Sequence, residues 1–297
     1  MKKRIGVIGV TGFVGRYVAA ALQARGDEVV GFSRSGGGNV TGVVEWRSSG
    51  PWDFTGIDGL INLAGERVDQ RWTAENRIKF EQSRVGMTKG IVAAIQEMPI
   101  HERPPVWVNA SAVGFYGDRQ DEVLDETSAP GSGYLAQLCV DWEAATEGVS
   151  ALGVRCVMVR IGMVIGRGGM AWDRLRRVFL LGAGARLGSG DQWMPWIHID
   201  DLVAGMLFSL DKQTITGVVN GVAPAPETNR DFTKKLAKAL HRPAPWVAPA
   251  FVLRTIFGEF GDFLLGGQRV MPRVWQQAGF VFSYPTLEQA LEELCQK

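Results

Sequence analysis

The stretch Gly9-Val10-Thr11-Gly12-Phe13-Val14-Gly15 joins an apolar run, Arg4–Val10, to an amphipathic segment, Phe13–Arg25. The run is typical of a buried β-strand and the segment of an α-helix. Glycine allows a tight turn and a close backbone approach to a pyrophosphate, and the third glycine lets the helix pack on the strand. The helix N-terminus then offers unpaired N–H groups to an anion. A glycine triplet alone would also fit an ordinary turn, but this strand-to-helix position predicts a dinucleotide-binding turn.

The segment after the second apolar run, Glu28–Phe32, is Ser33-Arg34-Ser35 and contains no acidic residue. An NAD-binding chain would usually place Asp or Glu about 20 residues beyond the glycines, where the carboxylate binds both ribose hydroxyls. Ser33 can instead donate a hydrogen bond, and Arg34 offers a planar cation that suits a 2′-phosphate, although a solvated loop arginine would have the same sequence. We therefore expect NADP(H) as the cofactor. Its predicted contacts in this part of the chain are Gly9, Thr11, Gly12, Phe13, Val14, Gly15, Ser33 and Arg34.

Apolar and amphipathic segments alternate over the first 160 residues. Several segments are apolar at successive positions, as expected of parallel strands that are covered on both faces. The predicted strands are Arg4–Val10, Glu28–Phe32, Gly42–Trp46, Gly59–Ala64, Val106–Ala110 and Val154–Arg160. The predicted helices are Phe13–Arg25, Thr73–Glu97 and Tyr134–Leu152. This alternation predicts an α/β fold, a Rossmann-type doubly wound parallel sheet with right-handed crossovers.

The pattern changes after Arg160, where loops rich in glycine, tryptophan and proline become frequent. Ile197–Ile199 and Gly217–Val222 still have strand character, and Asp200-Asp201 is expected to cap a helix that runs to about Leu210. Further helices are predicted over Trp172–Leu181, Asn229–Leu240, Ala250–Leu265 and Thr286–Gln296. We expect residues 1–165 to form an NADP(H)-binding Rossmann domain, with 197–222 returning to its sheet. Residues 166–196 and 223–297 would form a smaller, mostly helical C-terminal lobe that binds the substrate.

Composition excludes several classes of protein. The chain has 46% hydrophobic and 21% charged residues, the ordinary globular mix, and its net charge of +1 gives no reason to expect a nucleic-acid or membrane partner. Its three cysteines form no CxxC pair, and its three histidines lack metal-ligand spacing. No apolar run reaches the ~18 residues of a membrane span. The apolar run after the basic residues at the start of the chain is too short for a secretory signal. We therefore expect a cytoplasmic protein without a bound metal.

Several motifs together resemble those of the extended short-chain dehydrogenase/reductases. They are Gly9–Gly15, Asn62–Gly65, Ser111–Gly117, Tyr134 and Trp196–Asp201. More narrowly, the chain resembles an atypical branch of epimerase family proteins with a characteristic C-terminal segment. That match depends on Asn62–Glu66, Arg71–Thr73, Ser83-Arg84, Trp193–Asp201 and Gly266–Pro272, and it covers essentially the whole chain. The resemblance implies a Rossmann domain with a small substrate lobe. It is also compatible with a homodimer, because dimers are common in this superfamily.

The resemblance also implies further cofactor contacts. Leu63 and Ala64, at the end of the fourth predicted strand, should lie against the ribose and phosphates. Arg84 stands where extended members usually have an Asn near the cofactor, with an exposed helix cation as the alternative. Met163 belongs to the segment that corresponds to the loop beside the nicotinamide, although it would fit a core position equally well.

The chemistry of the superfamily uses a Ser or Thr, a Tyr and a Lys, the last two in a YxxxK motif. Ser111, just beyond the fifth predicted strand, matches the hydroxyl, and Tyr134 matches the tyrosine that exchanges a proton with the substrate. Leu138 replaces the lysine, which in relatives lowers the pKa of the tyrosine. A tyrosine with a pKa of about 10 is ionised in only about one molecule in a thousand at pH 7. Unless a cation such as Arg84 replaces the lysine, Tyr134 should be a poor general base and a better general acid.

Two functions remain open. The first is an NADP(H)-dependent oxidoreductase or epimerase-like enzyme that acts on a small carbonyl or sugar-like substrate, with carbonyl reduction easier than alcohol oxidation. The second, suggested by Leu138, is a catalytically silent NADP(H)-binding sensor or interaction protein. Independently of this choice, Tyr134 could be an aromatic packed on the sheet and Ser111 a hydroxyl that bonds the backbone. Tyr116 could line the substrate pocket or be a structural aromatic, and His198 is expected to be a structural histidine.

Overall fold

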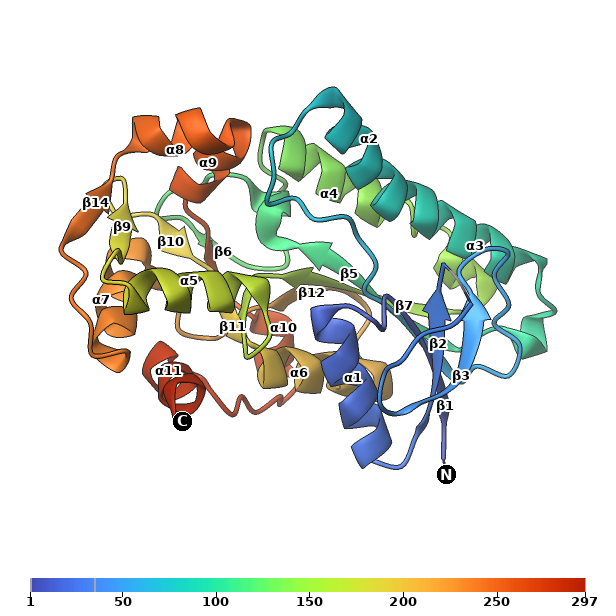
Figure 1. Ribbon diagram of the computed structural model, residues 1–297. Helices are drawn as coiled ribbons and strands as arrows, with labels where there is room; N and C mark the ends of the chain where they lie inside the picture. Colours follow the sequence, from blue (N-terminus) through green and yellow to red (C-terminus); the bar gives the residue numbers. More distant parts are fainter. Residues whose placement is uncertain (1, 35, 297) are drawn as a thin grey trace.

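The centre of the fold is a seven-stranded sheet with the order β12-β7-β5-β4-β1-β2-β3. Figure 1 shows the computed structural model, which describes residues 2–34 and 36–296. Every neighbouring pair of strands in this sheet is parallel. The strands are β1 (Arg4–Ile8), β2 (Glu28–Ser33), β3 (Val43–Ser48), β4 (Gly59–Asn62), β5 (Val106–Ala112), β7 (Arg155–Ile161) and β12 (Gly217–Gly221). The predicted doubly wound sheet of Rossmann type is confirmed.

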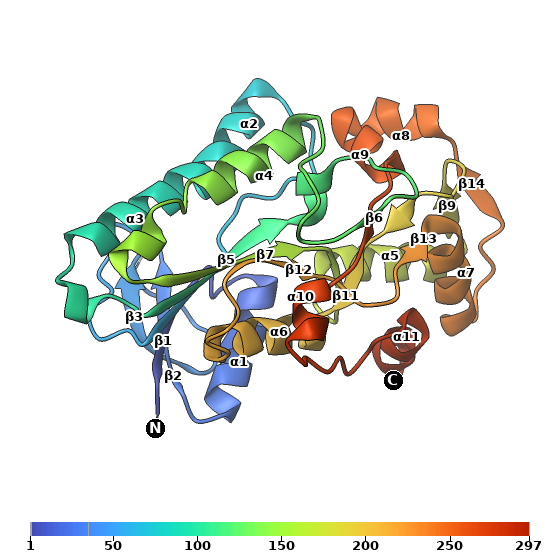
Figure 2. The same ribbon diagram turned by 180° about the vertical axis from the view of Figure 1, so that it is seen from behind.

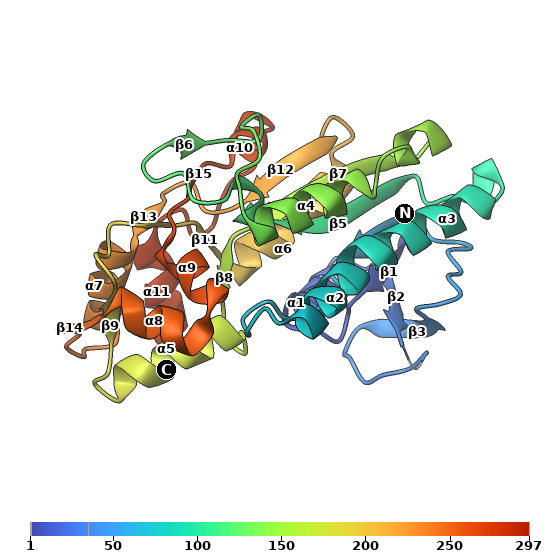
Figure 3. The same cartoon turned by 90° about the horizontal axis from the view of Figure 1, so that it is seen from above.

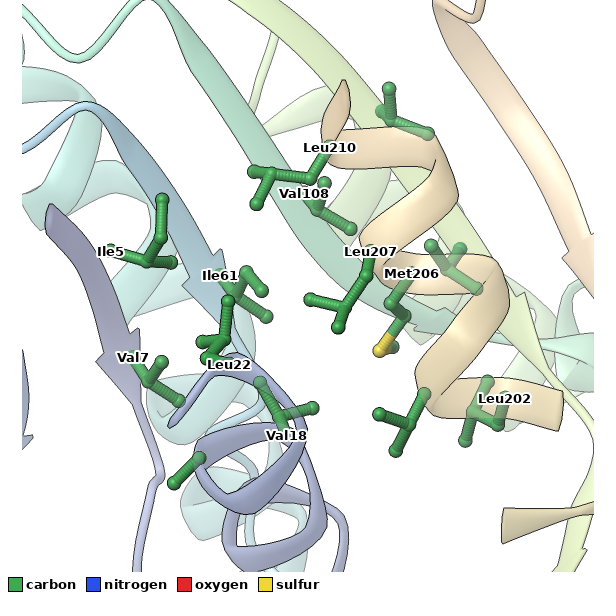
Figure 4. Packing of buried hydrophobic residues seen from close by; sticks show 14 of the residues in the cluster. Ile5, Val7, Val18, Leu22, Ile61, Val108, Leu202, Met206, Leu207 and Leu210 are labelled. Carbon is green, nitrogen blue, oxygen red and sulfur yellow. The ribbon is translucent and has the colours of Figure 1, made fainter. Parts of the chain in front are cut away.

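Helices cover both faces of this sheet (Figures 1 and 3). One face carries α1 (Phe13–Ala24) and α6 (Ile199–Asp211), and the other carries α2 (Ala74–Glu81), α3 (Met87–Glu97) and α4 (Tyr134–Ala144). Figure 4 shows Val18 and Leu22 of α1 and Leu207 of α6 packed with Ile61 and Val108 of the sheet. Full burial of such a side chain stabilises the folded state by about 1.5–3 kcal/mol relative to leaving the side chain exposed. Cover on both faces is the reason that the strands are apolar at successive positions.

The order of the strands reverses between β1 and β4. From β1 the chain moves outward to β2 and β3, and it then returns to β4 and continues to β5, β7 and β12 on the other side. The carboxyl ends of parallel strands lie at one edge of a sheet, and a crevice opens there where the order reverses. The loops after β1 and β4 meet at this point, since a Cβ on Gly9 would lie 2.9 Å from the Ala64 nitrogen. A ligand site is therefore expected at this edge.

A second group of elements packs at one end of the sheet (Figure 1). Its helices are α5 (Met170–Leu180), α7 (Asn229–Ala239), α8 (Ala250–Phe257), α9 (Glu259–Leu265) and α11 (Leu287–Cys295). Its short strands pair as β8 (Met163–Ile165) with β11 (Trp196–His198), β9 (Ala185–Leu187) with β14 (Trp246–Ala248), and β10 (Trp193–Met194) with β13 (Glu227–Thr228). Trp172, Phe232 and Leu291 are buried in an apolar cluster of these elements. This lobe therefore has a core of its own.

The C-terminal segment returns to the sheet after α9 (Figure 2). β15 (Arg269–Val270) pairs with β6 (Val123–Leu124), and α10 (Arg273–Gln277) then packs against β12. Trp275 of α10 is fully buried, and its indole N–H donates to the Ser209 hydroxyl of α6 at 2.9 Å. Residues just before β15 are thereby fixed close to the loop that follows β5. Within the residues described, no helix is long and apolar enough to cross a membrane.

Three predicted helices are shorter or less regular than the sequence pattern indicates. The helix predicted over Thr73–Glu97 contains a π-helical turn, Gln82–Gly86, between α2 and α3. The helix predicted over Tyr134–Leu152 ends at Ala144 and is followed by a 3₁₀ turn over Val149–Leu152. The helix predicted over Ala250–Leu265 breaks at Gly258, where a φ of +62° is open to glycine and strained for other residues.

The start of α6 also differs from the prediction that Asp200 and Asp201 cap it. The N-cap is His198, whose Nδ1 accepts a hydrogen bond from the Asp200 N–H at 3.2 Å. Asp201 is buried in the first turn and accepts from the N–H groups of Ser283 and Tyr284 at 2.7 and 2.9 Å. His198 thus has a structural role, as the sequence indicates, because its buried ring caps a helix.

Candidate functional site

The glycine turn joins β1 to α1 where the strand order of the sheet reverses. Gly9 has a φ of +78°, which residues with a side chain rarely adopt. A Cβ on Gly15 would lie 2.3 Å from the Gly9 carbonyl oxygen, so α1 can approach β1 this closely only with glycine there. Gly12 is the N-cap of α1 and, having no side chain, leaves the first N–H groups of the helix open to an external anion. This geometry fits a pyrophosphate.

The remaining predicted residues of the turn form its rim. Thr11 is exposed, and Phe13 and Val14 are half-buried. The rings of Phe13 and Tyr17 meet at a centroid distance of 5.5 Å, and a Cβ on Gly169 would lie 2.6 Å from Phe13 Cζ. The turn is therefore in contact with the loop before α5, which closes one side of the crevice.

Ser33 is the last residue of β2 and Arg34 follows it, at the same edge of the sheet. The Ser33 hydroxyl donates to the Gly37 carbonyl at 2.7 Å and accepts from the Gly37 N–H at 3.0 Å, so it fixes the loop. Arg34 is exposed, and its guanidinium forms no ion pair with any residue that the structure describes. An exposed arginine without a counter-charge, in a loop without Asp or Glu, fits a 2′-phosphate.

Leu63 and Ala64 lie across from the glycine turn. The Leu63 N–H donates to the Ile8 carbonyl at 2.9 Å, and the Ala64 N–H donates to Asn62 Oδ1 at 3.1 Å. Asn62 is itself held by the buried Asn109, whose Oδ1 accepts from Asn62 Nδ2 at 2.7 Å. The loop after β4 is therefore fixed in a position where its backbone can contact a dinucleotide bound at the turn.

Arg84 lies on the π-helical turn before α3 and reaches the loop after β4. A Cβ on Gly65 would lie 3.1 Å from Arg84 Nη2, and the Arg84 guanidinium carbon lies 5.2 Å from the centroid of the Trp142 ring. Burial lowers the pKa of Arg84, and no carboxylate in the described part of the chain forms an ion pair with it. A half-buried cation without a counter-charge fits an anionic ligand better than a solvated helix face.

Met163 is the first residue of β8. Its N–H donates to the Pro195 carbonyl at 2.7 Å, and its side chain packs against the cluster that contains Trp172 and Trp196. The structure thus places Met163 at the border of the lobe core. Its contact with a nicotinamide stays a prediction.

Ser111 lies within β5 and is almost fully buried. Its hydroxyl donates to Glu143 Oε1 of α4 at 2.7 Å. Arg160 of β7 donates to both oxygens of that carboxylate, with Nε–Oε1 and Nη2–Oε2 distances of 2.8 and 2.7 Å. Burial lowers the pKa of Arg160, but the hydrogen bonds and charge of Glu143 more than compensate and raise it. The Ser111 hydroxyl is thus engaged inside the protein, and its catalytic role stays a prediction.

Tyr116 is a structural aromatic and does not line the cleft that Tyr134 lines. It is 0% exposed, accepts a hydrogen bond from Arg160 Nη1 at 2.9 Å and donates to Asn220 Oδ1 at 2.7 Å. Burial raises the pKa of Tyr116 to about 12 although Arg160 acts in the opposite direction. The hydroxyl therefore belongs to a buried polar network that joins β7 and β12.

Tyr134 is the first residue of α4 and is half-buried beside a cleft. Its hydroxyl donates to the Arg77 carbonyl at 3.3 Å, a long hydrogen bond that a substrate oxygen could replace. The Arg77 guanidinium carbon lies 4.1 Å from the centroid of the Tyr134 ring, and the Trp72 ring lies 5.5 Å away. Burial and the charge of Glu81 raise the pKa of Tyr134 to about 12, against the effect of nearby arginines.

Leu138 lies one turn after Tyr134 and is 3% exposed, so no ammonium group occupies the position that would stabilise a tyrosinate. Arg84, the replacement cation that the sequence offers, does lower the pKa of Tyr134, but burial outweighs its effect. At neutral pH Tyr134 is thus a phenol, which can donate a proton and has almost no capacity to accept one.

The cleft beside Tyr134 has a volume of about 230 Å³. It separates the start of α4 from α9 and the segment that precedes β15. Trp72 and Asp118 line it on the side of the Rossmann sheet, and Phe263 and Gln268 line it on the side of the lobe. Of the two predicted catalytic residues, Tyr134 lines this cleft and Ser111 does not.

Four residues of the site are not found by the sequence pattern: Arg77, Glu143, Arg160 and Gln268. One signal was available, since Arg160 is a charged residue inside an apolar strand, and a buried charge needs a partner. That partner, Glu143, comes from a different element, so spacing along the chain does not identify it. Among the described residues, no group of three His, Cys, Asp or Glu side chains could hold a metal ion.

Comparisons with known proteins cover nearly the whole chain. The NAD dependent epimerase/dehydratase family model matches residues 5–220, and a domain of unknown function, DUF1731, matches residues 248–294. An epimerase family protein of Mycobacterium bovis is 38% identical over 97% of this chain and 96% of its own length. The crystal structure of the human epimerase family protein SDR39U1 with NADPH has a TM-score of 0.89 and 34% identity, over 98% of this chain and 99% of that chain. A nucleoside-diphosphate sugar epimerase from Corynebacterium glutamicum has a TM-score of 0.81 and 29% identity, over 99% of this chain and 58% of that chain.

Proposed function

Because this chain belongs to the NAD dependent epimerase/dehydratase family, we propose that it is an NADP(H)-dependent oxidoreductase or epimerase-like enzyme that acts on a small carbonyl or sugar-like substrate. The observation that carries the proposal is the glycine turn together with the acid-free loop at Arg34. The human relative that was crystallised with NADPH supports the choice of cofactor. We also propose that residues 1–165, with 197–222, form the cofactor domain and that residues 166–196 and 223–297 form the substrate lobe.

The chain's own residues would hold the cofactor by charge and backbone contact. The turn from Gly9 to Gly15 would bind the pyrophosphate, and Arg34 would bind the 2′-phosphate. Arg84 would add a second cation near the loop after β4. When bound, NADP(H) supplies the hydride that is exchanged with the substrate carbon.

Tyr134 would supply the proton. In the reducing direction the carbonyl carbon gains a hydride, the C–O π bond breaks, and the oxygen takes the proton from Tyr134 Oη, after which water reprotonates the tyrosinate. A tyrosine with a pKa of about 12 is deprotonated in about one molecule in 10⁵ at pH 7. The oxidising direction needs that rare form as its base, so reduction should be the easier direction.

We expect Tyr134→Phe to slow the oxidation of bound NADPH by a reactive carbonyl compound about 10²–10⁴-fold, because the general acid is lost. The affinity for NADPH should not change. Single-turnover absorbance with a panel of aldehydes and ketones measures the rate of NADPH oxidation. Tyr284→Phe is the matched control, because the Tyr284 ring packs against the His198 ring outside the cleft. An equal rate in wild type and Tyr134→Phe would exclude Tyr134 as the proton donor.

The same assay tests the pKa of Tyr134. A general acid works while protonated and loses activity as the pH rises through its pKa, which for Tyr134 is about 12. The rate constant for reduction should therefore show no loss due to this group up to about pH 10. A loss centred between about pH 6 and 8 that disappears in Tyr134→Phe would show that a neighbouring cation takes the place of the lysine after all.

One observation favours the second candidate, a catalytically silent NADP(H)-binding protein. Buried Leu138 stands at the lysine position of the YxxxK motif, so Tyr134 lacks the ammonium group that this motif would supply. Tight NADPH binding without consumption by any compound, and without an effect of Tyr134→Phe, would support this candidate over the enzyme.

A further inference from the structure

The cleft beside Tyr134 combines a wall from the sheet with a wall from the C-terminal segment. Gly114 and Tyr134 belong to the loop after β5 and the start of α4, whereas Phe263 and Gln268 belong to residues 248–294. A ligand in this cleft would thus touch the proposed proton donor and the domain of unknown function at once. The residues on the second wall are therefore placed to select the substrate.

Gln268 is a buried polar residue of the cleft whose side-chain amide has no partner within the described residues. It lines the cleft and is 4% exposed, and its side-chain amide forms no hydrogen bond with any other residue that the structure describes. The amide atoms of Gln268 are not among the buried side-chain atoms that lack both a partner and contact with solvent. The small exposed area of Gln268 therefore includes its amide. At 4% exposure the amide can contact little water, and a ligand oxygen or N–H would complete its hydrogen bonding.

The carboxylates that line the cleft are already engaged within the protein. Glu259 is paired with Arg77 at 2.6 Å, and Asp262 is paired with Arg254 at 2.7 Å. Asp118 accepts hydrogen bonds from two backbone N–H groups at 2.9 and 3.2 Å. Within the described residues, the lining contains no Lys or Arg. A phosphate or carboxylate would meet carboxylates without gaining a cation, which is unfavourable.

The volume and the lining of the cleft favour a small, planar molecule. The rings of Trp72, Tyr134 and Phe263 line it, and the first two have centroids 5.5 Å apart. Its volume of about 230 Å³ is below the range of about 300–1,000 Å³ that holds a drug-sized ligand. Aromatic walls contact planar apolar groups well, so an aryl or short alkyl group fits, whereas the phosphates of a nucleotide would lie among carboxylates.

We infer that this cleft takes a small uncharged carbonyl compound, whose oxygen or adjacent polar group is bound by the Gln268 amide, and that it rejects phosphorylated and nucleotide-linked substrates. The inference rests on the proposed function and narrows its substrate class. Gln268 acts as a specificity-determining residue. Its amide hydrogen-bonds the polar end of the ligand, while the aromatic rings pack against the apolar end. The domain of unknown function thereby becomes part of the substrate site.

Binding of unreactive probes tests this inference separately from turnover. Benzamide, benzoate and UDP-glucose would be titrated against the full chain with saturating NADP⁺, and binding would be followed by ligand-observed NMR. Benzamide and benzoate have nearly the same shape and differ in charge. We expect benzamide to bind at least about tenfold more tightly than benzoate and UDP-glucose. Benzoate or UDP-glucose binding as tightly as benzamide, or no benzamide binding, would overturn the inference.

Two variants show whether Gln268 is responsible. Gln268→Leu keeps the approximate size and removes the amide, so benzamide should bind about tenfold more weakly while NADPH affinity stays the same. Gln137→Leu is the matched control, because Gln137 is exposed on α4 and bonded to Asp141. An unchanged benzamide affinity in Gln268→Leu would refute the role of Gln268. Failure of the proposed function has a different signature, namely no NADPH binding or no NADPH consumption by any carbonyl compound.

Discussion

Glu143→Gln is expected to lower the free energy of unfolding by about 3–5 kcal/mol, because it leaves the Arg160 guanidinium buried without a counter-charge. The Arg160 and Glu143 side chains are only 4% and 13% exposed, and they form a bidentate pair. The Arg160 guanidinium carbon also lies 3.3 Å from the centroid of the Phe115 ring, so it has no room to move to solvent. The same change removes the charged acceptor of the Ser111 hydroxyl.

Urea denaturation followed by circular dichroism measures this loss. Glu75→Gln is the matched control, because it breaks an exposed pair with Lys79 on the surface of α2, and it should cost less than about 0.5 kcal/mol. The double variant Glu143→Leu/Arg160→Met removes both charges and should be less destabilised than Glu143→Gln. A loss below about 1 kcal/mol in Glu143→Gln would contradict the buried ion pair that joins α4 to β7.

Arg34→Ala is expected to weaken the binding of NADPH about 10–100-fold and the binding of NADH by less than about twofold. The reason is that a guanidinium gains charge-assisted hydrogen bonds to the 2′-phosphate, which NADH lacks. Arg34 is free of ion pairs within the described residues, so the substitution breaks no internal contact of that kind. Calorimetric titration of both cofactors measures the two affinities.

The control for Arg34→Ala is Arg242→Ala, another exposed arginine, which follows α7 far from the sheet edge. It should leave both affinities unchanged. A similar loss for NADPH and NADH in Arg34→Ala would mean that Arg34 contacts something other than the 2′-phosphate.

The parts of the fold that the sequence predicts are those set by local physics. A positive φ at Gly9 and the absence of a Cβ at Gly15 are requirements of one turn, and both are visible in the spacing of the glycines. The strands are likewise predicted by their apolar residues, because cover on both faces leaves few polar positions. The cofactor end of the site, which is built from the loops after β1, β2 and β4, follows from that same order of elements.

The substrate end of the site depends on contacts between distant segments. The hydroxyl of Tyr116 is bonded to Asn220, which is 104 positions away, so its burial cannot be inferred from its neighbours in sequence. Gln268 and Tyr134 line one cleft because β15 pairs with β6, a contact that two short strands do not signal. The helix break at Gly258 is not visible in the sequence pattern, because the amphipathic pattern continues through it.

Titration of the wild-type chain with NADPH and then NADH, by isothermal calorimetry, tests the central claim most directly. If the glycine turn binds a dinucleotide and Arg34 recognises its additional phosphate, both cofactors bind and NADPH binds at least about tenfold more tightly. Absence of binding by both cofactors, or tighter binding of NADH, would contradict the assignment of this edge of the sheet as an NADP(H) site.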